Sequence, residues 1–183
     1  MPSNILIISG TNRPGSNALK LSKLLATYYS AAGATADVLD LQELPPEAFA
    51  PTVFASKPPK VVELQNRVLQ ASGLHIVVPE YNGSFPGVLK HFIDLLKFPE
   101  SFEAKPVAFT GEAAGIWGGL RAVEHLQGVF GYRNAHAYPN RVFISGVGQK
   151  LNAEGQLTDA DLATRLNTQA AGFVDYITKL SGR

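Results

Sequence analysis

Short runs of apolar and β-branched residues recur along the chain, and segments with helical spacing separate them. We expect strands at five runs: Asn4–Ser9, Thr35–Leu41, Leu74–Pro79, Pro106–Thr110 and Arg141–Ser145. The first, third and fourth runs are almost continuously apolar, which is typical of strands covered on both faces. The pattern therefore predicts strands that alternate with helices.

The segments between these runs place apolar residues three and four positions apart, as in helices that bury one face. The first predicted helix contains Leu21 to Ala32, with Ser16 as a possible N-cap and Gly33 as a possible C-terminal cap. The last is predicted to begin at Thr158, which can cap it, with Asp159 and Asp161 at the positive end of the helix dipole. Three further helices are expected at 61–69, 88–96 and roughly 119–130.

Alternating strands and helices favour a parallel sheet with right-handed crossovers and helices on both faces. Five strands in this length fit the flavodoxin-like order 2-1-3-4-5, a three-layer α/β fold. We expect a single domain over residues 1–183. Five prolines lie in Leu44–Pro59, which we interpret as a long loop after the second strand. Such a loop is either functional or a plain surface excursion.

Composition narrows the possible functions. The chain has 183 residues, 45% of them hydrophobic and 17% charged, which indicates a globular protein with a real core. The net charge of +1 gives no electrostatic reason to expect a nucleic-acid or membrane partner. Cysteine is absent, so thiol redox chemistry and zinc–thiolate sites are excluded and any redox role needs a cofactor.

The N-terminal segment MPSNILIIS has no basic region and is interpreted as a first strand rather than a signal peptide. No apolar stretch approaches the roughly 20 residues that a membrane-spanning helix needs. The sequence therefore predicts a cytoplasmic protein.

In the predicted topology, ligands bind outside the carboxyl ends of the strands, between the first and third. The first loop at this edge, Gly10–Asn17, matches neither the dinucleotide fingerprint nor the nucleoside-triphosphate loop. Its hydroxyl, amide and guanidinium groups precede a helix N-terminus, a combination that can hold a phosphate. An ordinary turn capped by Ser16 explains the same residues.

Two further loops reach this edge of the predicted sheet. In the second, Asn82-Gly83 indicates a turn, with Pro86 in the first helical turn and Ser84 near the cap. Its backbone can present N–H and C=O groups to a planar heterocycle. The third loop has four glycines between Gly111 and Gly119, which permit close approach to a ligand. A plain turn and a flexible connection are the alternatives.

The motif GTxRxxSN from Gly10, the motif PEYNGSxPGxLK from Pro79 and the glycine-rich third loop give the chain its resemblance to a known family. The chain resembles the NADPH-dependent FMN reductases, a family with azo-, quinone- and chromate-reducing members. The second motif is the most specific part. One departure is Ile116-Trp117, which places bulk where similar proteins often have small residues. Trp117 could cover the flavin, fill the nicotinamide cleft or pack against a partner chain.

The resemblance implies noncovalently bound FMN and reduction by NADPH or NADH. It implies that electrons pass to a small acceptor such as a flavin, a quinone or an azo compound. It also implies a homodimer or homotetramer, with the helix over 88–96 at the interface. The implied cofactor-binding residues are Thr11, Arg13, Ser16 and Asn17 for the phosphate, Pro79, Glu80, Tyr81, Asn82 and Gly83 for the ring, and Gly111, Gly115, Trp117 and Gly118 along its other edge.

The cofactor carries the chemistry in this interpretation, so no catalytic side chain is assigned. The four histidines are scattered without metal-ligand spacing, and His75, inside a predicted strand, is interpreted as structural. Two alternatives remain open at this point. One is a flavodoxin-like carrier that docks to protein redox partners, although 15 acidic against 16 basic residues do not suggest an acidic docking face. The other is a family member that has lost FMN.

Overall fold

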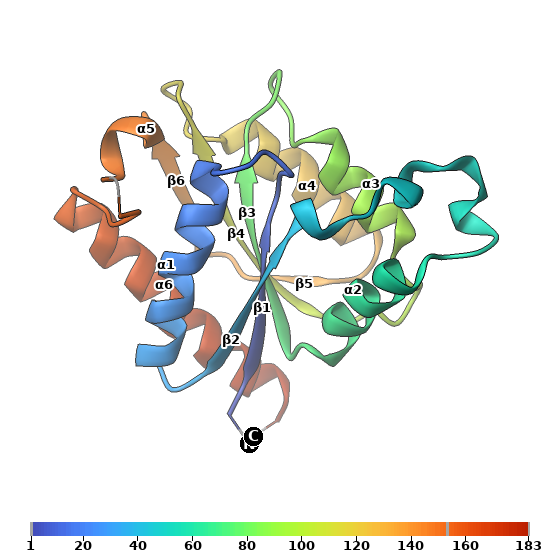
Figure 1. Cartoon of the computed structure of the whole chain (residues 1–183). Helices are drawn as coiled ribbons and strands as arrows, with labels where there is room; N and C mark the ends of the chain where they lie inside the picture. Colours follow the sequence, from blue (N-terminus) through green and yellow to red (C-terminus); the bar gives the residue numbers. More distant parts are fainter. Residues whose placement is uncertain (1, 153, 183) are drawn as a thin grey trace.

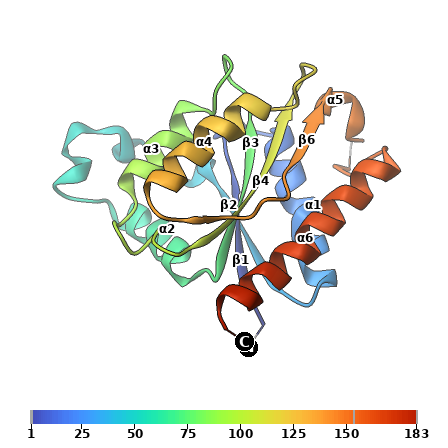
Figure 2. The same ribbon diagram turned by 180° about the vertical axis from the view of Figure 1, so that it is seen from behind.

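A parallel β-sheet forms the middle layer, and helices cover both of its faces (Figure 1). The structure, a computed structural model, describes residues 2–152 and 154–182, so residues 1, 153 and 183 of the expected domain lie outside the described residues. Helices α1 and α6 lie on one face, and α2, α3 and α4 lie on the other (Figure 2). The strands are β1 (Asn4–Ser9), β2 (Thr35–Asp40), β3 (Gly73–Pro79), β4 (Pro106–Ala113), β5 (His136–Ala137) and β6 (Val142–Ser145). The helices are α1 (Asn17–Ala31), α2 (Pro59–Gln70), α3 (Gly87–Leu95), α4 (Leu120–Tyr132), α5 (Val147–Lys150) and α6 (Ala160–Leu180).

The order of the sheet is β2-β1-β3-β4-β5, and β6 also pairs with β4. This confirms the predicted fold and order, with β6 as the predicted fifth strand. All pairings are parallel. The short strand β5 pairs with the beginning of β4 at Pro106 and Val107, while β6 pairs with its end from Thr110 to Ala113. Sequence reasoning missed β5 because two exposed residues carry no hydrophobic pattern.

Alternate side chains of each central strand point to opposite faces of the sheet. Ile5 and Ile7 pack in the core under α1 and α6, whereas Leu6 and Ile8 pack in the core under α2, α3 and α4. Both cores exclude solvent, which explains why β1 is apolar at nearly every position.

Helix ends follow the sequence signals with two corrections. Ser16 caps α1, because its Oγ accepts a hydrogen bond from the Leu19 amide at 3.2 Å. The prediction that Thr158 caps the last helix is wrong, since the carboxylate of Asp159 accepts from the Leu162 amide at 3.0 Å. The prediction that Pro86 lies in the first turn of α3 is also wrong, because Pro86 is the N-cap and the helix begins at Gly87.

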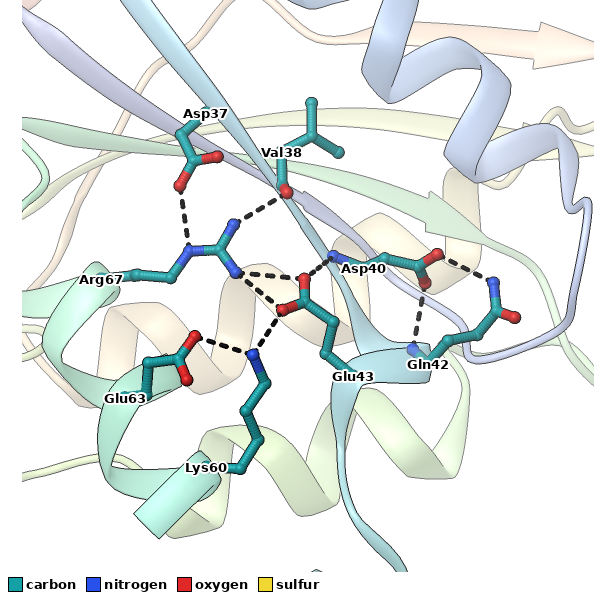
Figure 3. Close-up of polar contacts among 8 residues, drawn as sticks. All are labelled: Asp37, Val38, Asp40, Gln42, Glu43, Lys60, Glu63 and Arg67. Carbon is teal, nitrogen blue, oxygen red and sulfur yellow. Dashed lines mark hydrogen bonds and ion pairs between the residues drawn. The ribbon is translucent and has the colours of Figure 1, made fainter.

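The segment Leu44–Pro59 leaves the sheet and forms two single turns of 3-10 helix, Pro46–Phe49 and Pro51–Phe54. A cluster of ion pairs attaches β2 and the turn that follows it to α2, just before this excursion begins (Figure 3). Arg67 Nε donates to Asp37 Oδ2 at 2.9 Å, and Arg67 Nη1 donates to Glu43 Oε1 at 3.1 Å. Arg67 Nη2 also donates to the Val38 carbonyl at 2.8 Å. One guanidinium thus joins α2 to the edge strand β2 and to the turn that follows it.

Candidate functional site

The loops that follow β1, β3 and β4 meet in one pocket of about 370 Å³ at the carboxyl edge of the sheet. This is the edge where a parallel sheet of this order binds its ligands. Seven of the residues proposed from the sequence line it: Thr11, Arg13, Ser16, Asn17, Pro79, Glu80 and Tyr81. The other lining residues are Pro14, Gly15, Glu112, Ala113, Ala114, Val147 and Gly148. Chain segments far apart in sequence therefore build a single cavity.

The first loop leaves β1 at Gly10, where a side chain has no room. A Cβ atom there would lie 2.5 Å from the Val77 carbonyl oxygen, and the Gly10 amide donates to that same oxygen at 2.9 Å. The tight contact fixes the end of β1 against β3, so that Thr11 enters the pocket beside Tyr81. The Thr11 and Tyr81 hydroxyl oxygens lie 2.9 Å apart and share a hydrogen bond. This bond links the first loop to the second.

The second loop is a tight turn after β3. Tyr81 and Ser84 exchange backbone hydrogen bonds of 2.8 and 3.0 Å, and Asn82 and Gly83 both have positive φ, 52° and 75°. Two successive positive φ values define the hairpin turn that Asn-Gly favours, as the sequence predicts. Asn82 and Gly83 form the tip and do not line the pocket. Their amides donate no hydrogen bond to another backbone group in the described part of the chain.

The third loop uses its glycines differently from the expectation. A Cβ atom at Gly111 would lie 2.8 Å from the Gly118 carbonyl oxygen, and one at Gly118 would lie 2.8 Å from the Ile144 nitrogen. Both glycines therefore pack the loop against β4 and β6 rather than lining the pocket. Gly115 lies in open space, and Trp117 is 54% exposed with the Arg121 guanidinium carbon 5.7 Å from its ring centroid. A direct role of these four residues in FMN binding stays a prediction.

Sequence reasoning overlooked Glu112, the most unusual group at the pocket. It lies at the carboxyl end of β4 and is only 6% exposed. Burial raises the pKa of Glu112 to about 7, although the charge of Arg13 opposes the rise. The predicted strand ended at Thr110, so Glu112 was assigned to a loop. An acidic residue two positions beyond an apolar run was the available signal.

The sequence also gave no reason to place Val147 and Gly148 at the site. They reach the pocket because Gly146 adopts a positive φ of 59° after β6 and turns the chain into α5. Gly146 was the only local hint of this turn.

His75 is fully buried in β3, as expected for a structural residue. Among the described residues, no group of three or more His, Asp or Glu side chains is placed to hold a metal ion. Within the same ranges, every helix is too short or too polar to cross a lipid bilayer.

The sequence matches a known protein family and individual relatives. The NADPH-dependent FMN reductase family matches residues 3–150. An NAD(P)H-dependent FMN reductase of Pseudomonas aeruginosa is 30% identical over 183 residues, which cover 97% of each chain. A quinone reductase of Escherichia coli K12 is 33% identical over 127 residues, 67% of this chain and 68% of that protein.

Solved structures show the same relationship. FerB, a flavoenzyme NAD(P)H:(acceptor) oxidoreductase from Paracoccus denitrificans, superimposes with a TM-score of 0.82 at 26% identity. The superposition covers 97% of this chain and 98% of FerB. The family match, the full-length relative and the shared flavodoxin-like sheet agree, and the chain belongs to the NADPH-dependent FMN reductase family of FMN-using NAD(P)H oxidoreductases.

Proposed function

We propose that the pocket at the ends of β1, β3 and β4 holds FMN noncovalently and that this one domain reduces small acceptors with NADPH or NADH. One observation carries the proposal. The two loops with family motifs converge on a common cavity, joined by the hydrogen bond between Thr11 and Tyr81. Residues 11–17 would hold the phosphate, and residues 79–83 would lie against the ring.

The donor set suits a phosphate. Ser16 Oγ accepts from the Leu19 amide, which leaves the hydroxyl proton free to donate into the pocket. Tyr81 can donate its proton to Thr11, which leaves the Thr11 proton free in the same way. Arg13 adds a positive charge, and the N-terminus of α1 adds its dipole. These groups fit an anion without requiring a metal.

The second loop suits a planar ring. The backbone amides at Asn82 and Gly83 are available as donors at its tip, and the side chain of Tyr81 lines the cavity. Glu80 Oε2 is buried and has no hydrogen-bond partner among the described residues. A buried polar atom without a partner costs free energy, so a ligand that satisfies it would bind more tightly.

Bound FMN would accept hydride from the reduced nicotinamide and pass electrons to the acceptor. The side chains of this protein would then bind, orient and exclude water, and none is assigned as a catalytic residue. Acceptors of the quinone class are supported by the similarity to the Escherichia coli quinone reductase. Azo compounds and free flavins follow from the family resemblance.

The absorption spectrum of the purified protein is the first test. We expect a flavin spectrum, a chromophore that heat releases as FMN, and rapid bleaching on anaerobic mixing with NADPH. A protein that stays colourless on titration with FMN would contradict the proposal and favour loss of the cofactor. A bound flavin that only a protein partner reduces would favour the electron carrier, against which the family membership already argues.

Replacing Arg13 with alanine should weaken FMN binding by about 1–3 kcal/mol, because a charge-assisted phosphate contact is lost. Ser16→Ala should have an effect of similar size, but it also removes the cap of α1 and about 1 kcal/mol of stability. Arg13→Ala is therefore the cleaner test. Titration of the apoprotein with FMN measures the dissociation constant. Arg165→Ala, at an exposed position of α6, is the matched control, and equal constants for both variants would refute the assignment.

The assembly is proposed to be a homodimer or homotetramer that functions in the cytoplasm. A groove between α3 and α4 has Ile93, Val129 and Tyr132 among its lining residues, and Tyr132 is 81% exposed. The nearby Phe98 is 59% exposed, and the Arg133 guanidinium carbon lies 4.2 Å from its ring centroid. Exposed aromatic side chains of this kind are typical of interfaces. Light scattering after size exclusion gives the mass, and a monomer at micromolar concentration would contradict the proposal.

A further inference from the structure

Glu112 occupies an unusual position for an acidic residue. Side chains of β4 alternate between the faces of the sheet, and Ala108 packs in the core under α1 and α6. Thr110, two residues on, bonds to Gln169 of α6 on the same face. Glu112 follows on this face and lines the pocket at the N-terminus of α1. A carboxyl group with 6% exposure therefore faces the place where a phosphate is expected.

The charged side chains that share the pocket with Glu112 come from the first and second loops. Burial raises the pKa of Glu112, and the charge of Arg13 in the first loop lowers it by a smaller amount. The second loop contributes Glu80 and Tyr81 to the pocket, while α5 contributes only Val147 and Gly148. Lys150, also in α5, is paired with Asp159 at 3.3 Å. Within the described residues, the Glu112 carboxyl group takes part in no ion pair within 4.0 Å.

A phosphate in the pocket would place a second negative group near the Glu112 carboxylate. A phosphate monoester carries nearly two negative charges above pH 6.5, because its second pKa is about 6. A second anion in a poorly hydrated cavity raises the cost of keeping the Glu112 carboxylate ionised. Taking up one proton at Glu112 removes the repulsion between its carboxylate and the phosphate.

We propose that FMN enters the pocket together with a proton that the buried carboxyl group of Glu112 takes up. The inference depends on the proposed FMN site. Burial holds the pKa of Glu112 at about 7 before the ligand binds, so the group is partly ionised near neutral pH and has a proton to gain. Binding should raise this pKa further, and FMN affinity should therefore fall as the pH rises above 7.

The test compares dissociation constants of FMN and riboflavin for the apoprotein at pH 6.5 and pH 8.5. We expect the FMN constant of the wild type to rise about tenfold over this range, because ionised Glu112 must be protonated before the phosphate binds. Riboflavin lacks the phosphate, and its constant should change less than about twofold. Glu112→Gln should abolish the rise and bind FMN about tenfold more tightly than the wild type at pH 8.5. Glu124→Gln, at an exposed position of α4, is the matched control and should keep the wild-type profile.

Calorimetry gives a second measurement that needs no variant. Titration at pH 7.5 in buffers with different ionisation enthalpies should show uptake of about 0.5 proton or more per FMN bound by the wild type. The result supports the proposal even if Glu112→Gln does not fold.

Three results would overturn the inference. The first is an FMN constant with the same pH profile in the wild type and in Glu112→Gln. The second is an equal pH effect on riboflavin, which would mean that Glu112 senses the ring instead of the phosphate. The third is FMN binding without proton uptake at pH 7.5. Each leaves the FMN site intact, whereas absence of FMN binding at every pH would refute the proposed function as well.

Discussion

Acidification from pH 7 to pH 4 should lower the free energy of unfolding by about 3 kcal/mol through His75 alone. Burial lowers the pKa of His75 to about 3, whereas the unfolded chain should titrate near 6.5. The unfolded state therefore binds the additional proton between these values. The His75 contribution is fully present above pH 6.5 and is lost progressively as the pH falls toward 3.

The hydrogen bonds around His75 explain why it resists protonation. Thr110 Oγ1 donates its one proton to Gln169 Oε1 at 2.8 Å, so it must accept from His75 Nε2, also at 2.8 Å. His75 Nδ1 is then left as the acceptor for the Tyr29 hydroxyl at 2.7 Å. The neutral ring satisfies every partner, and a second proton would place a charge inside the core without a counter-ion.

Denaturant unfolding of the apoprotein at pH 7, 5 and 4 measures this effect. His75→Gln cannot titrate in this range, so its stability should fall less than that of the wild type by about 2 kcal/mol at pH 5 and about 3 kcal/mol at pH 4. His136→Gln, which changes an exposed histidine of β5, serves as the control and should follow the wild type. Parallel curves for the wild type and His75→Gln would show that His75 is not responsible.

Phe173→Ala should destabilise the protein by about 3–5 kcal/mol, because it removes a fully buried aromatic ring and leaves a cavity between α6 and the sheet. The Phe173 ring packs edge-on against Tyr29 and His75, with both centroid distances 6.4 Å. It also fills the space beside Gly73, where a Cβ atom would lie 3.0 Å from the ring. Tyr29 and His75 cannot move into the cavity without disturbing the hydrogen bond between them.

The loss should appear as a lower midpoint of denaturant unfolding at pH 7. Leu180→Ala, at a 44% exposed position near the end of the same helix, should cost less than about 1 kcal/mol. FMN affinity of folded Phe173→Ala should stay within about twofold of the wild type, because Phe173 does not line the pocket. A cost below 1 kcal/mol would mean that the helix–sheet contact is loosely packed.

The binding loops were predictable to different extents, and local chemistry explains the difference. The Asn82-Gly83 turn and the Ser16 cap each depend on a few neighbouring residues, so their sequence signals hold in the structure. The third loop was harder to interpret from its sequence. Its glycines indicated room for a ligand. In the structure, the backbone of Gly118 and the backbone of β6 approach Gly111 and Gly118 too closely for a side chain. A glycine is required wherever another group approaches the backbone closely, so the sequence cannot show whether that group is a ligand or another segment of the chain.

Glu112 is a second residue whose surroundings the local sequence did not predict. A charged residue after an apolar run is normally interpreted as the start of a solvated loop. It is buried here because β4 continues to Ala113 beside β6 and because the β1–α1 loop lies across its end. These contacts come from segments about 30 and 100 residues away, which no local pattern reports.

The sequence by itself determined the sheet order, the two helical layers and the edge at which the loops converge. Hydrophobic periodicity shows where the strands and helices lie, and their number and alternation fit one known sheet order, which also sets the ligand-binding edge. Only the tertiary structure decided that Glu112 is buried at the pocket, that His75 is neutral and that Trp117 stays exposed. Burial and pKa depend on which distant atoms replace water around a group, and folding alone sets those neighbours.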